Sequence, residues 1–310
     1  MIAAARHFIY RGGGRRAVPD DVTHVSIHES ITSIPLQAFH CHPNMVELIC
    51  HPGVYFIENR AFCMCSSLKR IVIPGVRFID FSAFLGCKDL TDVEGDMLER
   101  IGENAFGYCS SLRNINLLSI KFVGTHAFSE CEQLRDAIFS SNLESIKGVA
   151  FCGCSSLQRI TLPLKIGLIN LHHDRNHFDL FYLCTNLKHV DLVEGEVLNK
   201  TAAALLMEEW QDDMNIKIDS IAQILPNTFS GTRTLGVRGV DGKKGEVIQE
   251  WMTSVLRKVI YYKAEHNRSL KVAAAAFQPF VPNDIVTKNI IPFLELPSHK
   301  FQEEDEVAEE

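Results

Sequence analysis

The chain has 310 residues, of which 46% are hydrophobic, and a formal net charge of −7. This apolar fraction is enough for a continuous core, and no stretch approaches the roughly 18 consecutive apolar residues that a membrane helix requires. Residues 1–11 combine a short apolar run with an early Arg6, which does not fit a secretory signal peptide. We therefore expect a cytoplasmic protein, with the nucleus as the alternative, that is neither secreted nor inserted in a membrane.

Residues 1–30 are predicted to form an N-terminal β cap. Their apolar residues suit one or two short strands around the glycine turn 12–14. Val25 lies 23 residues before Leu48, so it belongs to a rung that precedes the first full repeat. The stretch 11–16 is rich in Arg and Gly but lacks the Lys-Ser/Thr of a phosphate-binding P-loop, so we interpret it as a turn.

An Ala-Phe dipeptide then recurs at spacings of 23, 22, 22, 22 and 23 residues, and a degraded copy follows 30 residues later. The copies are Ala38-Phe39, Ala61-Phe62, Ala83-Phe84, Ala105-Phe106, Ala127-Phe128, Ala150-Phe151 and Leu180-Phe181. A short alternating strand such as Ile71-Val72-Ile73 follows each copy. A fixed period of this length predicts a stacked solenoid, which we place at residues 31–198.

Six of the seven copies carry a cysteine three residues after the Phe: Cys65, Cys87, Cys109, Cys131, Cys154 and Cys184. Because they share one repeat position, we expect them to form an inward column, with one thiol in each coil. In a chain without a secretory route, thiols are expected to be reduced. We therefore interpret the column as structural.

The pattern resembles the BspA-type leucine-rich repeat. The block at residues 101–117, Ile-Gly-Glu-Asn-Ala-Phe-Gly-Tyr-Cys-Ser-Ser-Leu-Arg-Asn-Ile-Asn-Leu, shows the resemblance well, and it extends over about residues 22–193. The resemblance implies a curved solenoid with a ladder of parallel strands, and protein binding as the usual role. The predicted fold class is α+β: a leucine-rich-repeat solenoid of stacked short parallel strands followed by a C-terminal helical hairpin.

Two clusters have the residue types of a metal site. His172, His173, Asp174 and His177 lie in an insertion that interrupts the coils, and His40-Cys41-His42 precedes Cys63 and Cys65 by one coil. No regular pattern positions the first cluster as ligands, and the second is explained by ladder positions. We therefore predict neither a metal ion nor a cofactor.

Helical spacing replaces the repeat after residue 199. Two apolar stripes, each containing a Trp, predict a helical hairpin at 199–280 with a glycine-rich loop at 226–245. Its sequence resembles a segment that accompanies BspA-type repeats in a large, uncharacterised algal and protist family. A terminal amphipathic helix is expected at 281–300 and an acidic, disordered tail at 301–310.

One alternative concerns residues 281–297, which resemble the opening of an F-box and would make the protein a substrate adaptor of a ubiquitin ligase. Pro292 interrupts the helix that this motif needs. A helix that packs on the hairpin is the preferred interpretation.

No motif for nucleophilic, metal-dependent or nucleotide-dependent catalysis occurs, so we predict a non-catalytic protein-protein interaction scaffold. The expected surface is the strand ladder, where residues beside the inward apolar position point outward. Its predicted members are Glu47, Arg70, Asp92, Glu94, Asn114, Asn116, Asp136, Arg159, Thr161, His189 and Asp191. Their mixture of charges and amides suits an unidentified protein partner and does not suit nucleic acid.

Overall fold

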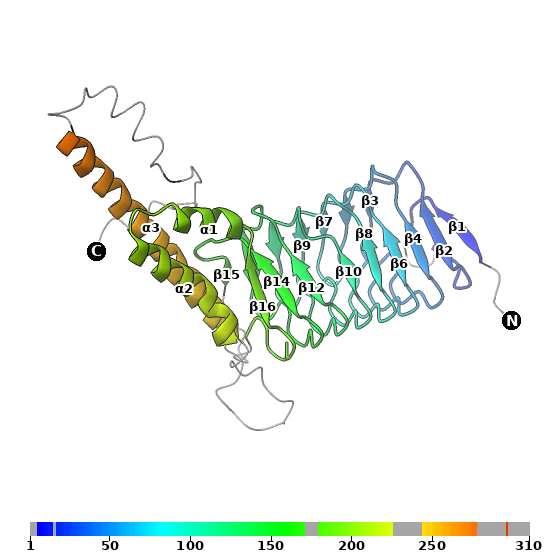
Figure 1. Cartoon of the computed structure of the whole chain (residues 1–310). Helices are drawn as coiled ribbons and strands as arrows, with labels where there is room; N and C mark the ends of the chain where they lie inside the picture. Colours follow the sequence, from blue (N-terminus) through cyan, green and yellow to red (C-terminus); the bar gives the residue numbers. More distant parts are fainter. Residues whose placement is uncertain (1–4, 15–16, 171–178, 226–243, 278–295, 297–310) are drawn as a thin grey trace.

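The computed structural model describes residues 5–14, 17–170, 179–225, 244–277 and 296. Short strands stack into an elongated solenoid, and three helices lie at the end formed by its last coils (Figure 1). None of the helices within these ranges is long and apolar enough to span a membrane. The arrangement is the expected α+β fold, a repeat solenoid followed by helices.

Two ladders of parallel strands run along the solenoid, and most coils contribute one strand to each. The first ladder contains β1 (His7–Tyr10), β2 (His24–Ile27), β4 (Glu47–Ile49), β6 (Arg70–Val72), β8 (Asp92–Glu94), β10 (Asn114–Ile115), β12 (Asp136–Ile138), β14 (Arg159–Leu162) and β16 (His189–Leu192). The second contains β3 (Ser33–Ile34), β5 (Phe56–Ile57), β7 (Phe78–Ile79), β9 (Arg100–Ile101), β11 (Phe122–Val123), β13 (Ser145–Lys147) and β15 (Ile169–Asn170). A bridge between Leu117 and Phe139 joins the two sheets of the first ladder.

The turn that carries each Ala-Phe adds a further set of bonds between coils. The Phe62 N–H donates to the Ala83 carbonyl of the next coil at 2.8 Å, and this bond recurs along the array. The residue before the Ala adopts a positive φ of 54–55° at Gln37, Arg60, Ser82, Asn104, His126 and Val149. Ala83 itself is 0% exposed and lies at a turn whose backbone is hydrogen-bonded to both neighbouring coils.

The Phe side chains form one continuous stack through the centre of the coils. From Phe39 to Phe181, successive ring centroids lie 4.8–5.9 Å apart, with interplanar angles of 2–19°. Tyr10 of β1 extends the stack at the N-terminal end, 4.8 Å from Phe39. These rings are fully buried, so the repeated Phe fills the middle of each coil.

The predicted inward column of cysteines is also present. Each of its six thiols is 0% exposed and donates to the carbonyl of the Phe in the preceding coil; the Cys109 Sγ, for example, lies 3.2 Å from the Phe84 oxygen. In the first full coil His42 takes this position, and its Nε2 donates to the Pro19 carbonyl at 3.0 Å. The column thus bonds each coil to the one before it.

The helical region consists of α1 (Gly195–Ala203), α2 (Glu208–Ile224) and α3 (Lys244–Phe277). α1 is a separate short helix that the sequence did not distinguish from the hairpin. α2 and α3 run in opposite directions: Trp210 stacks on Tyr262, and the Trp251 Nε1 donates to the Lys217 carbonyl at 3.0 Å. Asp213 binds both Lys258 and the Tyr262 hydroxyl. The predicted loop between these helices, except residues 244–245, lies outside the described residues, as does the acidic tail.

Two buried charges attach the helices to the last coil. The Asp179 carboxylate accepts a hydrogen bond from the Gly245 N–H, at the start of α3, at 2.7 Å. The adjacent Lys244 Nζ donates to the carbonyls of Cys184 and Leu187 at 3.0 and 3.1 Å. Asp179 and Lys244 are 8% and 3% exposed. Lys244 therefore satisfies carbonyls at the end of the solenoid that no further coil covers.

The Phe stack yields a prediction about stability. Phe106→Ala should lower the free energy of unfolding by about 3–5 kcal/mol, because it leaves a cavity between two rings. Tyr108→Ala in the same coil is the matched control, since Tyr108 is 57% exposed and should change it by less than about 1 kcal/mol. Urea denaturation of both variants measures the difference, and equal losses would contradict a central role for the stack.

The junction yields a second prediction, on pH. Burial raises the pKa of Asp179 from its ordinary 3.8 to about 6. A raised folded-state pKa means that Asp179 stabilises the fold most below pH 4 and that this contribution is lost as the pH rises through 6. The loss corresponds to up to about 3 kcal/mol at 1.4 kcal/mol per unit.

Asp179→Asn is uncharged at every pH and keeps an oxygen for the Gly245 N–H. The unfolding free energy of this variant, minus that of the wild type, should therefore increase between pH 4 and 6 and be constant above pH 7. Asp136→Asn, at an exposed position, provides the control for removing a carboxylate. A difference that does not vary with pH for Asp179→Asn would refute the raised pKa.

Candidate interaction surface

The outward side chains of the first ladder form two parallel rows, which together we name the strand face. The first row precedes the inward apolar residue of each strand: His24, Glu47, Arg70, Asp92, Asn114, Asp136, Arg159 and His189. The second row follows it: Ile9, Ser26, Ile49, Val72, Glu94, Asn116, Ile138, Thr161 and Asp191. Every residue that the sequence predicts for a partner surface lies in these rows, on one side of the solenoid.

Cross-strand hydrogen bonds hold many polar side chains of the strand face in place. Arg70 donates from Nη1 to Glu47 at 2.7 Å, and from Nε and Nη2 to Glu94 at 2.7 and 2.8 Å. Asn114 donates to Asp92 at 2.7 Å, and this hydrogen bond is the main reason that the pKa of Asp92 is lowered. Exposed pairs of this kind stabilise the fold by only about 0.2–1 kcal/mol each, so their main effect is to orient the side chains.

A second polar group lies toward the C-terminal end of the strand face. Arg159 and Asp191 approach to 3.4 Å, and Asn116 donates to Asp96 beside the second row at 2.8 Å. In the first row, Asp136 precedes Arg159 and His189 follows it. The surface therefore carries both acidic and basic side chains along its length.

The strand face also exposes apolar side chains that the sequence prediction omitted. Ile9, Ile49 and Ile138 of the second row are 55%, 40% and 48% exposed. Such residues were not selected because apolar residues in a strand usually point into the core. The sequence did contain a signal that these isoleucines point outward, because they occupy the same repeat position as the polar residues Ser26 and Thr161.

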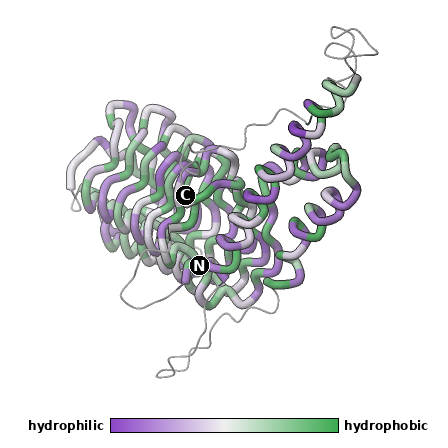
Figure 2. Tube along the Cα trace, turned by 90° about the vertical axis from the view of Figure 1, so that its left-hand side faces the viewer, coloured by the Kyte–Doolittle hydropathy of each residue, from purple (hydrophilic) through white to green (hydrophobic). Residues whose placement is uncertain are grey.

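A second surface on the other ladder was also not predicted. Phe56, Phe78 and Phe122 occupy one outward row of that ladder and are partly exposed. The Arg100 guanidinium lies in the same row, 4.9 Å from the Phe122 ring centroid, as a cation–π pair. Arg100 covers one of these rings, so this row is less available for contact than the isoleucines of the strand face. Along each coil, hydrophobic and hydrophilic residues alternate (Figure 2).

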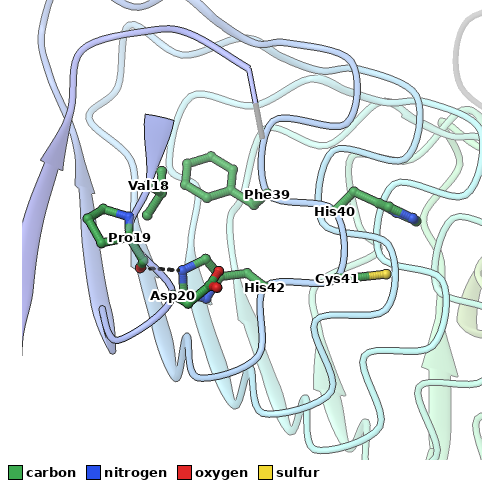
Figure 3. Close-up of a pocket in the computed structure, with 7 residues that line it drawn as sticks. All are labelled: Val18, Pro19, Asp20, Phe39, His40, Cys41 and His42. Carbon is green, nitrogen blue, oxygen red and sulfur yellow. Dashed lines mark hydrogen bonds between the residues drawn. The ribbon is translucent and has the colours of Figure 1, made fainter. Parts of the chain in front are cut away.

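A hollow of about 490 Å³ at the N-terminal end contains the predicted His40-Cys41-His42 cluster. His42 points toward Pro19 and Asp20, whereas His40 and Cys41 point away from it (Figure 3). Both ring nitrogens of His42 are engaged, because Nδ1 also accepts the Met45 N–H at 3.2 Å. The three side chains therefore do not converge on one point.

In the described part of the chain, no three His, Cys, Asp or Glu side chains are placed to hold a metal ion. The other predicted cluster, His172, His173, Asp174 and His177, lies outside the described residues. So does the F-box-like segment 281–297, apart from Leu296, which packs partly buried against the core.

The repeat region matches the family model described as a BspA type leucine rich repeat region, in six copies, over residues 20–113 and 77–192. The chain belongs to the BspA-type leucine-rich repeat family. This membership agrees with the Ala-Phe-x-x-Cys-x-x-Leu period and with the parallel ladders. No curated protein matches the chain.

Two solved structures that are similar to this BspA-type protein are leucine-rich repeat proteins. One from Bacteroides ovatus ATCC 8483 is 29% identical, with a TM-score of 0.43, over 46% of this chain and 38% of that chain. The T. pallidum leucine rich repeat protein is 29% identical, with a TM-score of 0.41, over 60% of this chain and 74% of that chain. The chain thus spans well under half of the Bacteroides protein.

The cysteines of this BspA-type protein yield a testable difference in reactivity. Burial raises the pKa of the Cys50 thiol to about 12 and raises that of the Cys87 thiol well above its ordinary value. Of the ten cysteines, Cys41 alone is not buried. Because the thiolate is the reactive form, a thiol reagent should label one cysteine rapidly in the native protein and ten after unfolding.

Mass spectrometry after a short labelling pulse identifies the labelled residue. Cys41→Ser should remove the rapid phase, whereas Cys109→Ser should leave it unchanged. Rapid native labelling of several column cysteines would show that the coils do not shield them.

Proposed function

We propose that this BspA-type protein is a non-catalytic scaffold that binds another protein through the strand face. The observation that carries the proposal is the combination of pre-ordered polar side chains with exposed isoleucines in adjacent rows. Arg70 is fixed between Glu47 and Glu94, and Ile49, two residues after Glu47 on the neighbouring strand, has 40% of its surface exposed. A surface that is ordered before binding loses less side-chain entropy on association.

The charge pattern supports a protein partner. Side chains of both charges occur along the first row, and the paired arginines are already compensated by carboxylates, which disfavours a polyanion such as nucleic acid. The partly exposed isoleucines provide apolar anchors that a protein interface buries. Successive rungs lie about 4.8 Å apart, so the rows extend far enough for a protein contact of ordinary size.

The distribution of perturbed groups supports a non-catalytic role. The large pKa shifts at Asp179 and the buried cysteines arise from burial at structural positions. On the strand face, Asp92 has a lowered pKa because Asn114 donates to it, which makes it a weaker base. Catalytic groups are usually tuned in the opposite way, toward neutral pH, inside a cleft. The cytoplasmic location remains a prediction.

The strand face can be tested with two matched triple variants. The first is Arg70→Ala/Asp92→Ala/Asn114→Ala on the strand face. The second, Arg100→Ala/Glu103→Ala/Ser145→Ala, removes one basic, one acidic and one neutral polar side chain on the other ladder or, for Glu103, in the turn directly after β9. Quantitative pull-down from a cell extract, with protein abundance compared between variants, should show at least a tenfold loss of specific partners for the first triple only.

Ile49→Asp tests the apolar part of the same surface. Because Ile49 is partly exposed, the substitution should leave the melting temperature within a few degrees of wild type while reducing capture of the same partners. Identical partner profiles for the wild type, the first triple variant and Ile49→Asp would remove the strand face as the binding surface.

A further inference from the structure

Within the described residues, no strand pairs with the outer edge of the last strand of the first ladder. β16 is terminal in its sheet, after β12 and β14. In earlier coils, the residues at the position of Leu192 donate to the next coil: the Cys50 N–H to Val72 at 2.8 Å and the Ile73 N–H to Glu94 at 2.7 Å. In a parallel ladder, alternate residues bond to opposite neighbours, so Val190 and Leu192 direct their N–H and C=O groups toward the outer edge. No described residue donates to or accepts from these groups there.

A cleft of about 290 Å³ lies between this edge and the helices. One wall is the whole of β16, and the opposite wall is formed by one side of α2 near Ile218, Asp219 and Ala222. Trp251 of α3 and Ile221 give the cleft an apolar floor. α2 thus contacts β16 but leaves room beside it.

An extended peptide fits these features better than a compact ligand does. Its backbone supplies the alternating N–H and C=O groups that an open strand edge lacks, which is the basis of strand addition. Because side chains alternate along a strand, every second residue of the peptide would turn toward the apolar floor. Asp219 forms no ion pair within the described residues, so a basic side chain would be favoured on the α2 side of the cleft, across from Lys188 beside β16.

We propose that the outer edge of β16 and the cleft beside it bind an extended segment of a partner protein, which is added as a further strand of the ladder. An apolar side chain of this segment packs against Ile218 and Trp251, and an adjacent Lys or Arg pairs with Asp219. The proposal deepens the proposed function and rests on it, because His189 and Asp191 of the strand face belong to the same strand.

The test is selection of a phage-displayed library of random dodecapeptides on the full-length protein. Ala222→Trp fills the cleft from an exposed position on α2. Val272→Trp adds the same side chain at a position of α3 that is 66% exposed and does not line the cleft. We expect enriched peptides with an apolar residue beside Lys or Arg. Their affinity should fall at least tenfold with Ala222→Trp and be unchanged with Val272→Trp.

Two further measurements distinguish strand addition from other contacts. Hydrogen exchange at the Val190 and Leu192 amides should slow in the complex. N-methylation of every second backbone amide of the peptide can be placed in two frames. It should abolish binding in the frame whose methylated amides face β16 and be tolerated in the frame whose methylated amides face away. Equal tolerance in both frames, or no enrichment of peptides sensitive to Ala222→Trp, would overturn the proposal.

The strand-face triple variant separates the two proposals. Peptides that bind the edge of β16 should bind Arg70→Ala/Asp92→Ala/Asn114→Ala with wild-type affinity. If the enriched peptides respond to the triple variant and not to Ala222→Trp, the proposed function stands and the edge of β16 is excluded. If neither the triple variant nor Ile49→Asp affects any partner while Ala222→Trp does, the strand face is excluded and the edge remains.

Discussion

The stacking of one Phe on the next sets the spacing on which the other bonds between coils depend. With ring centroids about 5 Å apart, the rings repeat at nearly the 4.8 Å separation of hydrogen-bonded strands. The same step lets the Phe N–H reach the next Ala carbonyl and lets each thiol reach the Phe carbonyl of the preceding coil. The same translation from one coil to the next, repeated along the solenoid, therefore buries the Phe rings and forms the hydrogen bonds between coils.

This regular interior leaves the exterior free to vary. Outward positions of the first ladder contain arginine, carboxylates, amides and isoleucine at equivalent sites, such as Arg70, Asp92 and Asn114 in one row. The hydrogen bonds between these side chains on neighbouring strands depend on the strand register and not on which residues form the core. A binding surface can thus change by single substitutions while the coil beneath it is conserved in shape, which suits a repeat protein that presents side chains to a partner.

Much of the solenoid was predictable because its signals are local and repeat. Ala-Phe, the following cysteine and the alternating strand recur at a fixed period, so each copy reinforces the assignment of the others. Features that depend on contacts between distant parts of the chain were not predictable. Asp179 and Lys244 lie 65 positions apart, and neither has a sequence signal for the other. The exposed isoleucines were missed because Ile49 resembles a core residue until its register is known. The cleft beside β16 depends on where α2 packs, which no periodicity specifies.

The bond from His42 to Pro19 makes the array directional. A column thiol must find a Phe carbonyl in the coil before it, and the first full coil has no such partner behind it. A longer imidazole spans to the cap at that one position. Duplication of an interior coil reproduces both donor and acceptor, whereas a duplicated first coil would place a His where a thiol fits. The array can therefore gain or lose coils in its interior during evolution, but its first coil is tied to its cap.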